Sequence, residues 1–298
     1  MDELLLISGC KVRIFEFMHK HTSLKLGGPA DFLIESSTEA ELMKALEFTR
    51  EEMVSLFVLG GGTNILVRDG GYRGIMIKLR GEYEKIEVHG ETHRCGAAAP
   101  LPVVVKIAAE SGLTGLEVLS GIPGTVGGAI CGNSGTKEGE VKDSLKSVTY
   151  IDEKLKKHLV AAEKLKFGYR TSEFKGEEKV ITYVEFLLKK GESSSIKAAG
   201  AEIIRKKKET QPLGQASAGC VFKNPPNNDP AGKLIEDSGL KGAKVGGAVV
   251  SMRHANYIIN IGRKASDMLA LIEKIKKTVF EKKGVKLEEE ILILGEDL

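Results

Sequence analysis

Two glycine-rich segments contain the residues of this chain that are best suited to holding a ligand. The segments are Gly60-Gly61-Gly62-Thr63-Asn64 and Gly121-Ile122-Pro123-Gly124-Thr125-Val126-Gly127-Gly128. Glycine adopts turns with positive φ at little cost, and a loop of successive backbone N–H groups binds anions. Both segments are therefore candidate sites for a phosphate or pyrophosphate. We expect the second segment to open a helix whose N–H groups face the anion.

Neither segment matches a common nucleotide-binding motif. The first follows an apolar strand, but it lacks the G-x-G-x-x-G spacing and is followed by a second strand, which excludes a Rossmann fingerprint. No Gly-Lys-Ser/Thr closes either segment, which excludes a P-loop. Tight turns between packed strands are an alternative explanation for either segment alone. Two such segments, each after an apolar strand, favour ligand binding.

Composition narrows the classes of function. The chain has 298 residues, of which 35 are glycine, and its formal net charge is only +3. A sequence-independent nucleic-acid binder is usually more basic, so we expect no nucleic-acid partner. No apolar stretch approaches the roughly 18 residues of a membrane span, so we expect no membrane segment.

Cysteine and histidine placement argues against a metal site or a disulfide framework. Cys10, Cys95, Cys131 and Cys220 include no Cys-x-x-Cys pair, which indicates a reducing compartment. His19 and His21 form a His-x-His pair with no further ligand nearby, so no metal is predicted. The apolar run from residue 4 to 7 is too short for a secretory signal and has no basic region before it, so we expect a cytoplasmic protein.

The elements that position these residues predict an α+β protein with a separate C-terminal domain. Capping signals and 3.6-residue periodicity predict helices, and short apolar runs between turn residues predict strands. The predicted strands are 31–35, 55–59, 65–67, 74–79, 84–89, 92–95, 147–151, 180–188, 249–250, 257–261 and 291–294, with strand-like character at 220–222. The predicted helices are 38–51, 100–110, one from a linker at 191–195 to 208, 231–238 and 266–283. The predicted domains are 1–82, 83–191 and 192–298.

Six segments, in order along nearly the whole chain, resemble the UDP-N-acetylenolpyruvoylglucosamine reductases, the MurB family. They are His21-Thr22-Ser23-Leu24-Lys25-Leu26-Gly27-Gly28-Pro29-Ala30-Asp31, Val58 to Val67, Gly115 to Gly128, Phe167-Gly168-Tyr169-Arg170-Thr171-Ser172, Ser217-Ala218-Gly219-Cys220-Val221-Phe222-Lys223-Asn224-Pro225 and Gly284 to Ile291. The combination is specific to that family.

The resemblance implies a flavoenzyme of peptidoglycan precursor synthesis. It implies a two-subdomain FAD-binding module of the vanillyl-alcohol-oxidase (PCMH) type, followed by an α/β C-terminal domain that binds the UDP-sugar. The chain is similar to the compact subclass, without an extra substrate-covering segment. The expected reductant is NADPH, the expected substrate is UDP-N-acetylglucosamine-enolpyruvate, and we expect a monomer. FAD is expected to bind non-covalently at Gly60, Gly61, Gly62, Thr63, Asn64, Ser120, Gly121, Ile122, Pro123, Gly124, Val126, Gly127 and Gly128.

The resemblance also assigns three catalytic roles. Arg170 matches the residue that stabilises the substrate carboxylate, for which a permanently charged bidentate donor is suited. Cys220 stands where the family more often has serine, the proton donor; the alternative is a buried small hydrophobe. Glu290 matches a glutamate that hydrogen-bonds the developing enolate. Three consecutive glutamates leave its register open, and Glu288 and Glu289 fit a charged solvent face.

The substrate-binding candidates are Tyr169, Lys223, Asn224 and Lys233. The run from Arg205 to Lys208 fits a solvated helix face. Two other functions stay open on the residues alone. One is a flavin oxidase acting on another substrate, and the other is a non-catalytic nucleotide-binding protein.

Overall fold

The computed structural model describes residues 9–298, so the prediction about residues 4–7 lies outside the described residues. The chain divides into two compact units. The first comprises residues up to 13, 32–61 and 74–206, and the second comprises residues 14–31, 62–73 and 207–298. Four elements run from one unit into the other: β1 (Lys11–Phe17), β2 (Pro29–Ser36), β5 (Tyr72–Leu79) and α5 (Ser193–Thr210). The predicted domains 1–82, 83–191 and 192–298 follow expected ligand-binding roles, whereas the two units are defined by packing. The three domains therefore stay a prediction.

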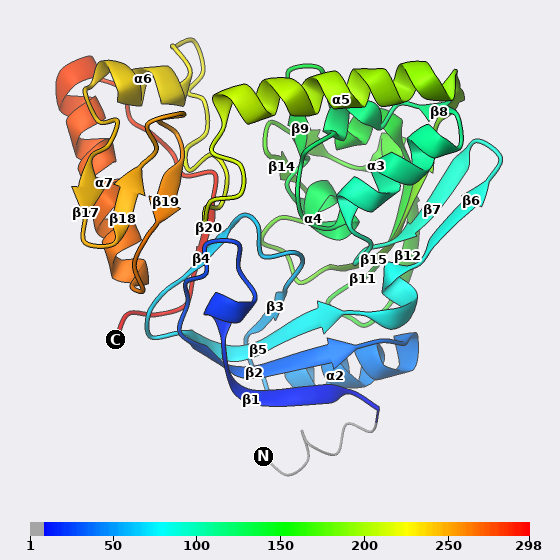
Figure 1. Ribbon diagram of the computed structural model, residues 1–298. Coiled ribbons are helices and arrows are strands. Elements are labelled where there is room, and N and C mark those ends of the chain that lie inside the picture. The colour runs from blue at the N-terminus through cyan, green and yellow to red at the C-terminus, as the bar shows by residue number, and fades with distance from the viewer. Residues whose placement is uncertain (1–8) are drawn as a thin grey trace. The chain divides into compact units, whose positions relative to one another are not determined.

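The first unit is built around antiparallel and mixed sheets (Figure 1). Its five-stranded sheet has the order β12-β11-β15-β7-β6 with antiparallel neighbours, and a second sheet has the order β1-β2-β5-β3 with β3 parallel to β5. Its other elements are α2 (Glu39–Glu51), β3 (Leu56–Val58), β6 (Ile86–His89), β7 (Thr92–Gly96), α3 (Leu101–Glu110), β8 (Leu113–Thr114), α4 (Val126–Cys131), β9 (Gly135–Thr136), β10 (Gly139–Glu140), β11 (Leu145–Ile151), β12 (Lys157–Ala161), β13 (Phe167–Gly168), β14 (Thr171–Ser172), β15 (Val180–Leu187) and β16 (Lys189–Lys190).

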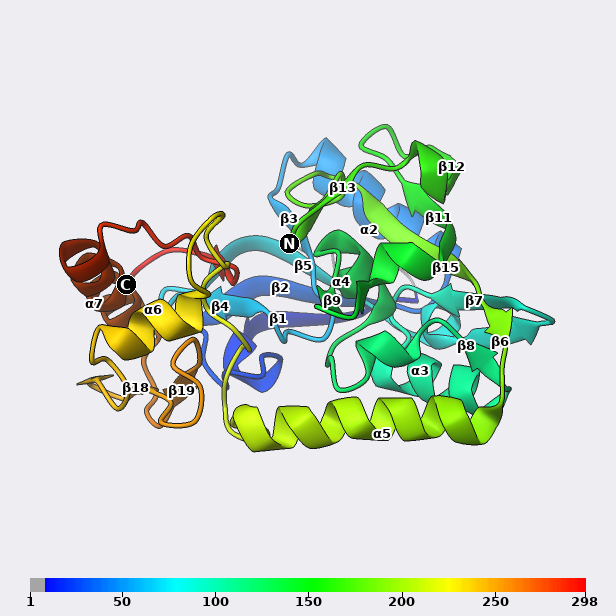
Figure 2. The ribbon, with the colours of Figure 1, turned by 90° about the horizontal axis from the view of Figure 1, so that it is seen from above.

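Local sequence explains the helices of this unit. Thr38 caps α2, since its hydroxyl accepts the N–H of Glu41, and the Glu41 carboxylate accepts the N–H of Ser37. The apolar residues of α3 join the core that the five-stranded sheet also lines. Figure 2 shows the long α5 lying along α3, and the Ser193 hydroxyl at its start donates to the Ala109 carbonyl.

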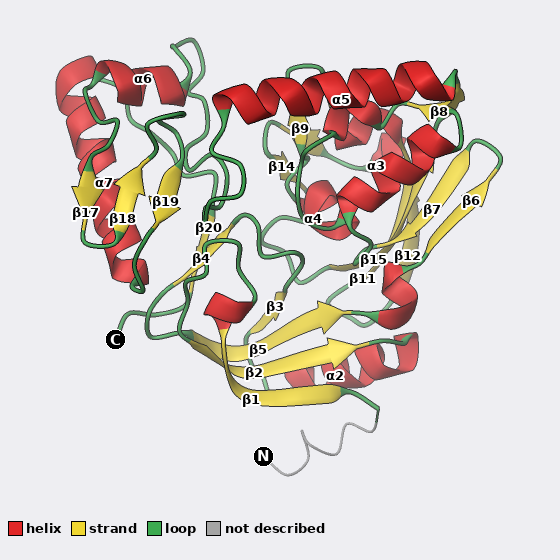
Figure 3. Ribbon diagram, in the orientation of Figure 1, coloured by secondary structure: helices red, strands yellow, loops and turns green. Residues whose placement is uncertain are grey.

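The second unit has its own core between a small sheet and α7 (Figure 3). Its elements are β4 (Ile65–Val67), α6 (Ala231–Asp237), β17 (Lys244–Val245), β18 (Ala248–Val250), β19 (Ile258–Asn260), α7 (Ala265–Lys283) and β20 (Leu292–Leu294). The strands β17, β18 and β19 form an antiparallel sheet, and β20 pairs with β4 in parallel. The apolar stripe of α7 is fully buried at Met268, Leu271, Ile275 and Val279.

A carboxylate from far along the chain caps α7. The two oxygens of Asp69 accept the N–H groups of Ala265 at 2.6 Å and Ser266 at 2.9 Å. Burial raises the pKa of Asp69, but these backbone donors outweigh burial and leave its pKa below the ordinary value. Asp69 therefore joins the segment after β4 to the helix that fills the core of this unit.

Most predicted elements are confirmed within a few residues, and two predictions are wrong. Residues 193–195 are not a linker, because α5 begins at Ser193. Residues 220–222 form no regular strand and make only isolated bridges, from Cys220 to Tyr257 and from Phe222 to Glu289. No helix within residues 9–298 is both long and apolar enough to cross a bilayer.

Candidate active site

The two glycine segments touch in the first unit. A Cβ at Gly61 would lie 2.7 Å from the Cα of Gly124, which is closer than real Cβ contacts come. A Cβ at Gly60 would lie 2.8 Å from the hydroxyl oxygen of Thr125. Glycine is therefore required at position 61 because two backbones pass in direct contact.

Around this contact the loops carry unused donors. Among residues 9–298, the amides of Gly60, Gly61, Gly121, Gly124 and Thr125 have no protein acceptor. Gly60, Gly124 and Thr125 are half-buried and Gly61 and Gly121 are exposed, so these donors are accessible to an anionic ligand. Sequence reasoning did not select Thr125, which lies between selected residues and has no glycine signal of its own.

The helix that follows plays a different part from the one predicted. The first two amides of α4 donate within the protein, Val126 to the Ala99 carbonyl at 3.0 Å and Gly127 to the Ala97 carbonyl at 2.8 Å. The prediction that the N–H groups of this helix face the anion is therefore wrong for these two residues. The open donors lie in the loop before α4.

In the second unit, the continuation of the first glycine segment supports another part of the site. The carbonyl of Gly62 accepts the N–H of Ser23 at 2.9 Å. The side-chain amide of Asn64 donates to the Glu290 carbonyl at 3.2 Å, and the Asn64 carbonyl accepts the N–H of Leu292 at 3.0 Å. Asn64 thus holds the backbone on both sides of Ile291.

Arg170 lies at the tip of a short hairpin in the first unit. The strands β13 and β14 pair Gly168 with Thr171, so Tyr169 and Arg170 form a two-residue turn. Arg170 has φ 56°, a left-handed conformation that bulky residues rarely adopt and that is common at functional sites. Its guanidinium donates to the Gly135 carbonyl at 3.0 Å and lies 5.3 Å from the Tyr169 ring centre.

A buried asparagine anchors this hairpin. The side-chain amide of Asn133 donates to the Gly168 carbonyl at 3.0 Å and to the Glu140 carboxylate at 2.9 Å. Its side-chain oxygen is fully buried and has no donor within residues 9–298. This orphaned acceptor lies beside the Arg170 hairpin, and a buried group without a partner marks a site of local strain or of a bound water. Sequence reasoning missed Asn133, because no local pattern marks it.

Cys220 and Glu290 lie on adjoining backbone segments of the second unit. The N–H of Glu290 donates to the Val221 carbonyl at 2.8 Å, and the N–H of Lys223 donates to the Glu288 carbonyl at 2.8 Å. Tyr257, a residue that sequence reasoning did not select, forms an isolated antiparallel bridge with Cys220, and its hydroxyl interacts with the Cys220 thiol. The structure therefore brings two of the three predicted catalytic residues together, while Arg170 belongs to the other unit.

The three consecutive glutamates have different surroundings. Lys223 binds the carboxylate of Glu288, and Lys276 binds that of Glu289 at 2.7 Å. The charge of Glu290 instead acts on Tyr257, the partner of Cys220. The selection of Glu290 by the motif stays a prediction.

The predicted substrate-binding side chains are spread over both units. Tyr169 is 49% exposed at the hairpin tip. The side-chain oxygen of Asn224 accepts the N–H of Ala231 at the start of α6, at 3.0 Å. Lys233 is exposed and pairs with Asp229 at 2.6 Å. If Lys223, Asn224 or Lys233 binds substrate, its side chain must first release its present protein partner.

The histidine pair is engaged in local contacts. His21 lies 2.9 Å from the Glu16 carboxylate, and its hydrogen bond lowers the pKa of Glu16. His19 packs against the Phe17 ring with ring centres 5.5 Å apart. Across residues 9–298, no three His, Cys, Asp or Glu side chains gather in a metal-binding cluster.

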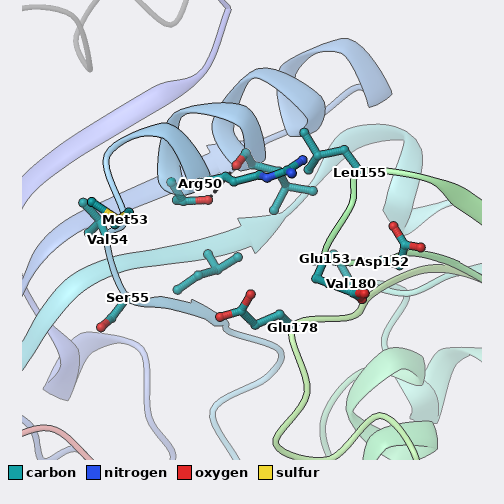
Figure 4. Close-up of a pocket in the computed structure, with 12 residues that line it drawn as sticks. Arg50, Met53, Val54, Ser55, Asp152, Glu153, Leu155, Glu178 and Val180 are labelled. Atoms are coloured by element: carbon teal, nitrogen blue, oxygen red, sulfur yellow. Dashed lines mark hydrogen bonds between the residues drawn. The ribbon is translucent and has the colours of Figure 1, made fainter.

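A cavity of about 370 Å³ in the first unit lies among residues that carry none of the predicted roles (Figure 4). Its charged lining comprises Arg50, Asp152, Glu153 and Glu178. Asp152 is already bound, since its carboxylate accepts the N–H groups of Lys154 and Lys156 and contacts His158 at 2.7 Å. The cavity therefore adds no group to the candidate active site.

Comparison with known proteins gives full-length matches. Residues 30–154 match the FAD binding domain family, and residues 211–294 match the family "UDP-N-acetylenolpyruvoylglucosamine reductase, C-terminal domain". The reductase of Caldanaerobacter subterraneus subsp. tengcongensis is 42% identical over 287 residues, which cover 96% of this chain and 94% of the relative. The reductase 2 of Symbiobacterium thermophilum is 37% identical and covers 96% of this chain and 92% of its own length.

One solved structure extends this likeness to the fold. The crystal structure of the UDP-N-acetylenolpyruvylglucosamine reductase from Thermus caldophilus superposes with a TM-score of 0.84 at 38% identity. The alignment covers 96% of this chain and 99% of that one. Together with the two family matches, it confirms the predicted fold class, an FAD-binding module followed by a C-terminal reductase domain.

Proposed function

The chain belongs to the family of UDP-N-acetylenolpyruvoylglucosamine reductases, and on that premise we propose that it reduces the enolpyruvyl group of UDP-N-acetylglucosamine-enolpyruvate to UDP-N-acetylmuramate with NADPH as reductant. It is an oxidoreductase with an FAD-binding domain. The observation that carries the specific reaction is the placement of Cys220 beside Glu290 on hydrogen-bonded segments. An enolate needs a proton donor and a stabilising group together.

The residues present fit FAD. Open amides at Gly60, Gly61, Gly121, Gly124 and Thr125 supply donors for its pyrophosphate, and a Cβ at position 61 would fill the space between the loops. The buried oxygen of Asn133 offers an acceptor for a further polar group. Bound FAD supplies hydride transfer between NADPH and the vinyl group.

The side chains of this enzyme manage the charge that the reaction creates. Hydride addition to the terminal carbon places an electron pair on the neighbouring carbon, delocalised into the carboxylate. Arg170 offers two parallel N–H donors to that carboxylate. Glu290, when protonated, donates to the enolate oxygen. Cys220 then delivers its proton, so the S–H bond breaks as the C–H bond forms and a thiolate remains.

Rapid-mixing kinetics of the two half-reactions test this assignment. Arg170→Ala and Glu290→Gln leave flavin reduction by NADPH nearly unchanged, and each slows flavin reoxidation by substrate about 10²–10³-fold, because the charge develops only in that half. Arg205→Ala and Glu289→Gln are matched controls, since these residues pair with Glu202 and Lys276. Equal slowing of both half-reactions in a variant would indicate a structural role instead.

The same purified protein distinguishes the proposed reductase from the two other functions that the residues leave open. A purified protein with no flavin spectrum would support a non-catalytic nucleotide-binding protein. Reduction by NADPH without reoxidation by UDP-N-acetylglucosamine-enolpyruvate would support a flavin oxidase acting on another substrate. We expect flavin that is released completely on acid precipitation, since neither glycine segment contains a His or Cys for covalent attachment.

A further inference from the structure

Tyr257 is a buried side chain that lies outside the six motif segments and is bridged to a predicted catalytic residue. It lies directly before β19, is 8% exposed, and forms an isolated backbone bridge with Cys220. Directly bridged residues carry neighbouring side chains on the same face, so the Tyr257 hydroxyl interacts with the Cys220 thiol, and Glu290 also acts on that hydroxyl. Both predicted catalytic residues of the second unit therefore interact with this one phenol.

The position of the phenol is set by rigid neighbours. The N–H of Tyr257 donates to the His254 carbonyl at 3.0 Å, and its carbonyl accepts the N–H of Ser251 at 2.9 Å. The rings of Tyr257 and His254 meet edge to face with centres 5.0 Å apart. The adjacent Asn256 donates to the Phe222 carbonyl and accepts the Phe222 N–H, which fixes the cysteine-bearing segment against it.

The hydrogen-bonding capacity of the Tyr257 hydroxyl and the Cys220 thiol determines which group donates to the other. Burial, then Cys220 and Glu290, raises the pKa of Tyr257, so the hydroxyl keeps its proton throughout the working pH range. A phenol has one proton to donate, and a thiol has one S–H together with a sulfur that accepts. When the phenol donates to sulfur, the S–H bond stays available for the substrate.

We propose that Tyr257 is a positioning residue for the proton donor: its hydroxyl donates to the Cys220 sulfur, directs the S–H bond toward the substrate and stabilises the thiolate that proton delivery leaves. This role rests on the proposed function. In the step, the electron pair of the enolate carbon takes the thiol proton, and the thiolate regains a proton from water. No group is oxidised or reduced in this step.

The titratable groups around Cys220 and Tyr257 leave the charge of a Cys220 thiolate uncompensated, so a hydrogen-bond donor such as the Tyr257 hydroxyl would stabilise it. Glu290, which is protonated in the proposed mechanism, supplies no positive charge to offset a thiolate nearby. His254 offers no compensating charge at neutral pH, because burial lowers its pKa. The phenol O–H is therefore a donor that can compensate the charge of the Cys220 thiolate.

The pH dependence of Cys220 alkylation tests the role without reference to turnover. Iodoacetamide reacts with the thiolate, and mass spectrometry of the Cys220 peptide reports its rate across pH. We expect Tyr257→Phe to raise the pKa of Cys220 by about one unit, since a hydrogen bond to the charged form favours that form. Burial raises the pKa of Cys95 to about 12 and of Cys131 to about 11, so these thiols react slowly over the same range.

Matched variants separate positioning from general damage. Tyr72→Phe removes another phenol hydroxyl from the same unit, one whose pKa burial also raises, and should leave the Cys220 profile unchanged. In turnover, Tyr257→Phe should slow flavin reoxidation, move the alkaline limb of activity upward and spare flavin reduction by NADPH. In a Cys220→Ser background the same change should not move an alkaline limb.

Two results would overturn the role. An unchanged Cys220 pKa in Tyr257→Phe would show that the phenol does not donate to sulfur, and a lowered pKa would show that the thiol donates to the phenol instead. Failure of the proposed function has a different signature. The parent enzyme would then show the alkylation behaviour expected here but no reoxidation by UDP-N-acetylglucosamine-enolpyruvate.

Discussion

Asn256 is expected to hold the cysteine-bearing segment in place, and its replacement tests the architecture of the site. Its side-chain oxygen accepts the Phe222 N–H at 2.9 Å, and its side-chain nitrogen donates to the Phe222 carbonyl at 2.8 Å. Asn256 is 3% exposed and Phe222 is 1% exposed. Within residues 9–298, these are the hydrogen bonds that satisfy the Phe222 backbone.

The loss of folding free energy in Asn256→Ala comes from the Phe222 backbone groups that lose their hydrogen-bond partners. The substitution orphans one buried N–H and one buried carbonyl, and each orphaned group costs about 1–3 kcal/mol. The space vacated by the side chain admits water, which places each cost toward the lower end. We therefore expect a loss of about 2–4 kcal/mol in the stability of the second unit.

Hydrogen exchange gives the direct readout. The Phe222 amide should lose its protection in Asn256→Ala, and flavin reoxidation should slow while reduction by NADPH persists. Asn256→Asp is the sharper variant, because its ionised carboxylate keeps the acceptor but turns an oxygen toward the Phe222 carbonyl. Its folded-state pKa is then raised, so stability relative to the parent should recover as pH falls. Unchanged protection of the Phe222 amide in both variants would show that the Asn256 side chain does not hold the Phe222 backbone.

Three further predictions concern the framework. Gly61→Ala should weaken flavin retention and lower the melting temperature, because its Cβ would meet the Gly124 backbone at 2.7 Å; Gly132→Ala, whose Cβ meets its nearest atom, the Gly128 carbonyl oxygen, at 3.6 Å, is the control. His93→Leu should raise stability near neutral pH by about 1–2 kcal/mol, because both ring nitrogens are buried without partners among residues 9–298. Burial lowers the folded-state pKa of His93, so the parent should lose stability as pH falls below about 6.5, and denaturant titrations of the variant should lack that loss. Asp69→Ala should cost about 1–2 kcal/mol by removing the cap of α7, with Asp69→Asn less damaging. The Asp69 pKa is lowered on folding, so this contribution should disappear in the parent only as pH falls below about 4; an equal melting temperature for both variants and the parent would contradict the capping role.

Elements with local signals were predictable from the sequence. Thr38 and Glu41 mark the start of α2 by their own side chains, and the structure shows both in capping contacts. The cap of α7 was not predictable, because Asp69 lies 196 residues away from Ala265 along the chain. Ser193 begins α5 although a Gly-Glu-Ser-Ser-Ser run is typical of a linker, since tertiary contacts such as the bond to Ala109 outweigh weak local propensity.

The residues of the candidate site likewise differ in whether a local sequence signal marks them. Arg170, Cys220 and Glu290 lie in contiguous motifs, so the sequence alone identified them as candidates. Tyr257 and Asn256 act across isolated bridges between segments that are distant in sequence, and neither has a periodic or capping pattern. The sequence alone likewise did not show that Lys223 and Lys276 bind the carboxylates of Glu288 and Glu289.

The glycine segments show that packing and ligand binding are not competing explanations here. Gly61 must be glycine because its backbone passes against Gly124, and that contact alone would fit tight turns between strands. The same contact places loops side by side whose amides at Gly60, Gly121 and Thr125 have no acceptor among residues 9–298. Gly121 is exposed and Gly60 and Thr125 are half-buried, so an anion can reach these donors. We therefore propose that close packing of the two backbones is the means by which the chain presents a concentrated set of donors to an anion.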